Sequence, residues 1–145
     1  MSAPSRPRAS GIGRVLVAVY AVLALAAVGR STFQIIDRFD DAPIAYALSA
    51  VAAVVYVVAT VALAAGWHVL AWIAVTFELA GVLVVGALSV FAPHVLGLDT
   101  VDPFGREATV WSVFGAGYVF VPLVLPVLGI IWLRSRSRSR IAVDV

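Results

Sequence analysis

The sequence contains four long apolar segments, and they constrain the fold more than any other feature. They cover residues 14–30 (bracketed by Arg14 and Arg30), 43–66, 69–91 and 110–133. A membrane-spanning helix needs about 20 apolar residues, whereas the strands of a membrane barrel alternate apolar and polar side chains, which these segments do not. The pattern predicts an all-α integral membrane protein with four transmembrane helices.

The composition agrees with this interpretation. Of the 145 residues, 63% are hydrophobic and 12% are charged, whereas soluble domains are about 45–50% apolar and about 25% charged. A soluble protein of this length could not bury so much apolar surface, so we expect lipid to be its solvent. One helical bundle uses the whole chain. We expect a tail over 1–13, a transmembrane domain over 14–133 with helices at about 14–32, 43–66, 69–91 and 110–133, and an arginine-rich tail over 134–145.

The arginines predict the orientation in the membrane. All ten basic residues are arginines, and seven of them lie near the two chain ends, whereas segments 30–43 and 92–109 are each net negative. Cytoplasmic segments of membrane proteins are enriched in Arg and Lys. We therefore expect an antiparallel up-down bundle in a bacterial plasma membrane, with both termini in the cytoplasm.

The first apolar segment also allows a different interpretation. Arginines, an apolar run and "ALA" at 24–26 are typical of a cleavable signal peptide, and its removal would leave three helices. We favour a retained helix because the run ends in Gly29-Arg30, and "STFQIIDRF" then places Phe33, Ile36 and Phe39 on one helical face.

The "RSRSRSR" motif at 134–140 follows the last apolar segment directly. It resembles RNA-binding arginine–serine segments, but its position favours a membrane anchor, since each arginine near anionic lipid contributes about 1 kcal/mol. We expect no nucleic-acid partner, and the predicted surface anchors are Arg134, Arg136, Arg138 and Arg140.

Glu78 is the strongest candidate for a functional residue. It lies near the centre of the segment 69–91, about 12–14 Å into the helix at 1.5 Å per residue. An ionised carboxylate at that depth costs about 2.5–3.5 kcal/mol, so we expect the neutral acid, which can donate a hydrogen bond. Its helical neighbours Ala71, Ala74 and Gly81 are small, which indicates a face that packs against another helix.

Counting residues from the helix ends suggests which groups meet Glu78. The candidates at similar depth are Tyr20, Tyr56, Thr60 and the carbonyls freed by a kink at Pro122 and Pro126. Three roles remain open for this intramembrane polar site. Glu78 is a clamp that fixes the packing of the helices, a contact for a partner's helix or a ligand, or a group that transfers protons or ions.

Other chemistry has little support in the sequence. There are no cysteines, and the two histidines, His68 and His94, fall on opposite sides of the predicted membrane, so we expect no metal, no cofactor and no catalytic residues. The charged residues of the outer face could bind a cation, a substrate or a partner's loop, but they form no spacing motif, so we favour their interpretation as solvated loops and helix caps. They are Arg30, Asp37, Arg38, Asp40, Asp41, His94, Asp99, Asp102, Arg106 and Glu107.

Three stretches together resemble a known family: "GRSTFQIIDRFDDAPIAYALSAVAAVVYVVAT", "FELAGVLVVGALSVF" and "ATVWSVFGAGYVFVPLVLPVLGIIWL". They are similar to small actinobacterial integral membrane proteins with four predicted helices and no established activity. The resemblance implies a four-helix protein of the bacterial plasma membrane, and it implies no site residues.

The sequence thus favours a non-enzymatic accessory or assembly subunit, or a homo-oligomer, which contacts the bilayer and a membrane-protein partner or itself. The alternative is a small transporter or channel-like component that uses Glu78 for proton or cation coupling. A lipid-processing enzyme acting through the outer carboxylates is a third interpretation.

Overall fold

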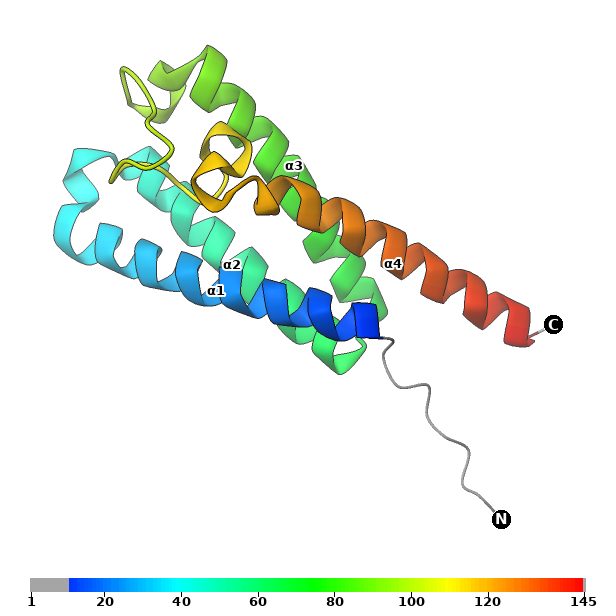
Figure 1. The fold of residues 1–145 in the computed structure, drawn as a ribbon. Helices are drawn as coiled ribbons and strands as arrows, with labels where there is room; N and C mark the ends of the chain where they lie inside the picture. The colour runs from blue at the N-terminus through cyan, green and yellow to red at the C-terminus, as the bar shows by residue number, and fades with distance from the viewer. Residues whose placement is uncertain (1–10, 145) are drawn as a thin grey trace.

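The fold is a set of packed helices, described by a computed structural model for residues 11–144, with side chains to residue 138. Within that range there is no strand. The long helices are α1 (Gly11–Arg38), α2 (Pro43–Ala65), α3 (His68–Phe91) and α4 (Val121–Asp144), and the short 3₁₀ helices are η1 (Phe39–Asp41), η2 (Pro93–Leu96) and η3 (Ser112–Tyr118). The start of α1, the α2–α3 turn and the end of α4 lie toward the same end of the molecule (Figure 1).

Among residues 11–144, three helices are long and apolar enough to cross a membrane, and η3 with α4 makes a fourth if this bent pair counts as one span. The bounds of α2 follow from local sequence: Pro43 occupies the first turn, where its missing N–H costs nothing, and Gly66 ends the helix with a left-handed φ of 75°. α3 begins only two residues later, so the chain reverses direction in a very short turn (Figure 1).

α1 extends to Arg38, past the expected end of the span near residue 32, so the helix continues into "STFQIIDRF" as its amphipathic pattern predicts. Its last turns carry the predicted amphipathic pattern, with Phe33 and Ile36 exposed and Gln34 buried. The Gln34 side-chain amide donates to the backbone carbonyls of Arg106 (2.8 Å) and Ala108 (3.1 Å). The end of α1 therefore anchors the loop that follows η2.

The expectation of a single helix over 110–133 is wrong in its first third. η3 and α4 meet at an angle of 98°, and the left-handed residues Val113, Phe114, Gly115, Val119 and Phe120 interrupt the helical backbone. Glycine lowers helix propensity, and the residue before a proline disfavours the α conformation, so "GAGYVFVP" is a poor helix. The break precedes Pro122, and α4 is not interrupted at Pro126.

The same helix is longer than expected at its other end. α4 continues through the arginine–serine repeat to Asp144, so residues 134–144 form a helical arm and not an irregular tail. The predicted N-terminal tail lies outside the described residues except for Gly11–Gly13, which are helical.

The segment from Thr109 to Phe120 folds back among the long helices, and we call it the re-entrant segment. In Figure 1 it lies beside the upper half of α3. Trp111 is only 1% exposed, and its ring packs on α3 at Gly81, where a Cβ would come within 2.6 Å of the indole. Phe114 packs in the same way on Gly86. Two glycines of α3 thus provide the space that this segment fills.

We expect Gly81→Ala to lower the free energy of unfolding by about 1–3 kcal/mol, because the added methyl group overlaps the buried Trp111 ring. Gly29→Ala is the matched control in α1, since a Cβ there meets nothing within 4 Å. Alanine is the better helix former by about 1 kcal/mol, so the control should be neutral or stabilising. Unfolding titrations in detergent measure both, and equal effects would contradict the described packing.

Candidate functional site

Glu78 lies on the buried face of α3 with no exposed surface. Its neighbours along that face are Ala71, Ala74, Val75 and Val82, all buried. The small alanines let adjacent helices approach closely, so the carboxyl group lies among side chains from several segments. Within the chain alone, a partner's helix has no access to it.

Tyr20 of α1 provides the hydrogen bond to this carboxyl group. Its hydroxyl donates to Glu78 Oε2 at 2.6 Å, and both residues are fully buried. That distance is short, as hydrogen bonds between a hydroxyl group and a carboxyl group usually are. The bond joins α1 to α3 across the core.

Tyr56 of α2 and Trp111 of the re-entrant segment complete the group. The indole N–H of Trp111 donates to the Tyr56 hydroxyl at 3.2 Å, and the rings of Tyr20 and Tyr56 lie 6.2 Å apart. Because Tyr56 accepts from Trp111, its own hydroxyl hydrogen is left to donate. The Tyr56 side chain interacts electrostatically with the Glu78 carboxyl group. We call Tyr20, Tyr56, Glu78 and Trp111 the buried polar cluster.

One carboxyl oxygen of the cluster lacks a close hydrogen bond within the described part of the chain. Among the described residues, Glu78 Oε1 has no hydrogen-bond partner within the usual distance. A buried acceptor without a partner costs about 1–3 kcal/mol. One oxygen of the carboxyl group is therefore held by a short hydrogen bond from Tyr20, whereas the other has none within the usual distance from any described residue.

The remaining sequence candidates take no part in the cluster. The Thr60 hydroxyl donates to the Tyr56 carbonyl of its own helix at 2.7 Å. Pro122 and Pro126 are buried in α4, but α4 approaches the cluster at Gly129, where a Cβ would lie 3.4 Å from the Tyr20 hydroxyl. The structure therefore brings Tyr20 and Tyr56 to Glu78 and leaves Thr60 and the two prolines apart from it.

Trp111 is the member of the cluster that the sequence did not indicate. Tryptophans near the ends of apolar segments usually lie at the membrane interface, and hydropathy does not distinguish those from a core tryptophan. The available signal was Gly81, one turn from Glu78, which leaves room for a large ring.

A local turn holds Trp111 in place. The Ser112 hydroxyl accepts the Thr109 N–H at 2.8 Å, and the Thr109 hydroxyl accepts the Trp111 N–H at 3.1 Å. These bonds give the backbone an alternative to helix, as Ser and Thr side chains often do. Arg30 adds a bond from its guanidinium to the Ala108 carbonyl at 2.7 Å. The turn thus fixes the indole on the cluster.

The charged residues of the other loops are dispersed. Arg38 pairs with Asp41 at 3.4 Å, and the Asp102 carboxylate accepts the Phe104 N–H at 3.0 Å, as in an ordinary turn. No group of three or more His, Asp or Glu side chains that could hold a metal ion occurs among the residues that the structure describes. Arg134, Arg136 and Arg138 lie on the helical arm of α4, and the side chain of Arg140 is outside the described residues.

Comparisons of the chain with protein-family models, with curated proteins and with solved structures give no match. The resemblance to small actinobacterial membrane proteins stays a prediction.

We expect Tyr56→Phe to destabilise the fold by about 1–3 kcal/mol, because it leaves the buried indole N–H of Trp111 without an acceptor. Tyr46→Phe is a matched control on the same helix. Tyr46 is also fully buried, but its hydroxyl has no hydrogen-bond partner among the described residues, so its removal should be neutral or stabilising. Thermal unfolding in detergent compares the two, and a larger loss for Tyr46→Phe would refute this assignment of bonds.

Proposed function

We propose that the chain is a multi-pass integral membrane protein of the bacterial plasma membrane that acts as a non-enzymatic accessory or assembly subunit. The observation that carries this proposal is a ridge on the exposed face of α3. Ile73 is 60% exposed and Phe77, one turn further, is 51% exposed. An apolar groove lies on each side of this ridge, with volumes of about 460 and 500 Å³.

Such a surface suits a second helix. Side chains spaced four apart form ridges that fit the grooves of a neighbouring helix, and helices associate in membranes through close packing of this kind. Ala50 and Ala74 line one groove and Ala80 the other, so a partner helix can approach closely. We propose that a transmembrane helix of a partner protein packs against this ridge.

The proposed orientation places both termini in the cytoplasm, in an antiparallel arrangement of four spans of which the fourth is broken. It is supported by the arginines at the two chain ends and by the position of the start of α1 and the end of α4 near the α2–α3 turn (Figure 1). The buried polar cluster then acts as a clamp inside the subunit, which fixes the shape of the surface offered to the partner.

We expect Phe77→Ala to reduce the amount of complex recovered from native membranes by about tenfold, since large aromatic side chains dominate the binding energy of most interfaces. Phe33→Ala is the control, because Phe33 has a similar exposure (54%) on α1. Co-purification in mild detergent and native gels measure the complex. A complex containing only copies of this chain would identify the partner as itself. Recovery of a monomer alone from native membranes would exclude the proposal.

A second function is favoured by the position of Glu78, whose carboxyl group is fully buried near the middle of the apolar helix α3. Ionisable groups in such positions often mark proton or ion pathways, so we also propose proton or cation coupling at Glu78.

Liposome flux assays separate the two functions. If Glu78 is a clamp, Glu78→Gln should be nearly silent, since an amide still accepts from Tyr20 and can also donate. Glu78→Leu should destabilise the fold by about 1–3 kcal/mol, because it leaves the Tyr20 hydroxyl unpaired. A proton or cation flux that is present in the native protein and abolished by Glu78→Gln would favour coupling over the clamp.

A further inference from the structure

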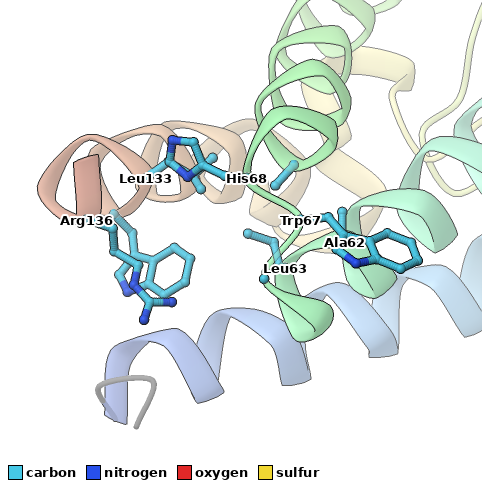
Figure 2. Close-up of a pocket in the computed structure, with 9 residues that line it drawn as sticks. Ala62, Leu63, Trp67, His68, Leu133 and Arg136 are labelled. Carbon is cyan, nitrogen blue, oxygen red and sulfur yellow. The ribbon is translucent and has the colours of Figure 1, made fainter. Parts of the chain in front are cut away.

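A small polar pocket lies where α2, α3 and α4 meet, at the end of the molecule that carries the arginines (Figure 2). It is lined by the last turn of α2 with Gly66, by His68 at the start of α3, and by Trp132 and Arg136 of α4. Its volume of about 30 Å³ admits one small group.

The Arg136 side chain is held in place at this pocket. Its guanidinium lies 4.9 Å from the centre of the Trp132 ring, and the indole in turn packs on α1 at Gly13, where a Cβ would come within 2.7 Å. A guanidinium held over an aromatic ring has its planar set of N–H donors already positioned, so it loses little freedom on binding a ligand. Figure 2 shows this side chain beside the start of α1.

Contacts between α3 and α4 fix the opposite wall. The His68 Nε2 atom accepts the indole N–H of Trp72 at 3.1 Å and lies 2.9 Å from the Ser137 hydroxyl. Because Ser137 follows Arg136 directly, this contact holds the arm of α4 against the start of α3. The walls of the pocket are thus set by the fold without any ligand.

Four arginines whose side chains the structure describes gather at this end of the molecule. Arg14, Arg134, Arg136 and Arg138 lie here, and no salt bridge to any of them occurs among the side chains that the structure describes. Apart from Glu78, the acidic side chains described lie in the last turn of α1, in η1 and in the segment 99–107, at the other end. The α3 helix also begins at the pocket without a side-chain cap, and a helix N-terminus adds to the attraction for an anion.

An apolar groove adjoins the pocket and indicates the kind of anion. It is shallow and open, is lined by Trp67, His68, Val69, Leu70 and Ile73, and shares Trp67 and His68 with the pocket. Val69 is 72% exposed and Trp67 is 55% exposed, so the groove is open to the surroundings of the helices. A ligand with an anionic head and an apolar chain fits both spaces at once.

We propose that this pocket binds the phosphate group of an anionic phospholipid, with Arg136 as the main contact and an acyl chain in the adjoining groove. This site differs from the general attraction of a basic arm to a membrane, because it requires one arginine in one position. The inference rests on the proposal that the chain lies in a membrane with its arginines at the cytoplasmic surface.

The test compares arginines of the same arm. The purified protein is placed in nanodiscs of phosphatidylcholine containing a small fraction of phosphatidylglycerol, and the lipids retained after extraction into mild detergent are counted by native mass spectrometry. We expect Arg136→Gln to lower the ratio of retained phosphatidylglycerol to phosphatidylcholine by about tenfold or more, since a charged hydrogen bond and the general attraction are both lost. Arg138→Gln removes the same charge from an exposed position, and its loss should be about fivefold or less.

Arg136→Lys distinguishes geometry from charge. It keeps the charge but loses the planar, stacked guanidinium, so it should retain less phosphatidylglycerol than Arg138→Gln. Equal losses for Arg136→Gln and Arg138→Gln, or equal retention of the two lipids by the native protein, would overturn the proposal.

Inorganic phosphate provides the second arm of the experiment. If phosphate alone in detergent raises the melting temperature as much as phosphatidylglycerol does, and Arg136→Gln abolishes both effects, the pocket serves soluble phosphates and the lipid proposal is overturned. Recovery of the protein in the membrane fraction is scored separately. A protein absent from membranes contradicts the proposed function, whereas a membrane protein without lipid selectivity contradicts only this site.

Discussion

The structure depends on one constraint: a carboxyl group lies at the middle of an apolar helix and must find its hydrogen bonds inside the protein. Glu78 obtains one from Tyr20 of α1, and Tyr56 of α2 interacts with the same group while it accepts the N–H of Trp111. In a medium without water each of these bonds is stronger, and each unpaired group is costlier. The cluster therefore joins three long helices and the re-entrant segment through a few atoms.

The re-entrant segment has a strained backbone, and this strain opposes the formation of the cluster. Four non-glycine residues in it, Val113, Phe114, Val119 and Phe120, have left-handed backbones, and such residues cost about 1–3 kcal/mol each. Burial of the indole on Gly81, its bond to Tyr56 and the local turn of Thr109 and Ser112 all act against that cost. A straight helix over the same residues would avoid the strain but would also withdraw Trp111 from Tyr56. The broken fourth helix and the polar cluster are thus one feature.

The parts of the fold that sequence predicts well are those in which local signals agree. The bounds of α2 and α3 lie within one residue of those expected, because long apolar runs coincide with Pro43 and Gly66. The segment 110–120 is also largely apolar, but apolar content cannot distinguish a helix from a left-handed turn. The contacts that decide its conformation are made with α2 and α3. Depth along the helices was enough to bring Tyr20 and Tyr56 level with Glu78. Depth could not show that the Thr60 hydroxyl donates to the Tyr56 carbonyl, one turn earlier in the same helix, since this bond depends only on local geometry.

The burial of Glu78 also determines what proton or cation coupling at this residue would require. The carboxyl group is fully buried, so a proton or cation can reach it only if a neighbouring group moves. α1, α2 and α3 are long regular helices, whereas the segment that carries Trp111 has a strained backbone and two hydroxyl-containing side chains beside the indole. Movement of this segment would remove the Trp111 donor from Tyr56 and withdraw the indole that packs on Gly81, one turn from Glu78. A clamp therefore requires the re-entrant segment to stay fixed, and coupling requires it to move, so the two functions differ in the behaviour of a single element.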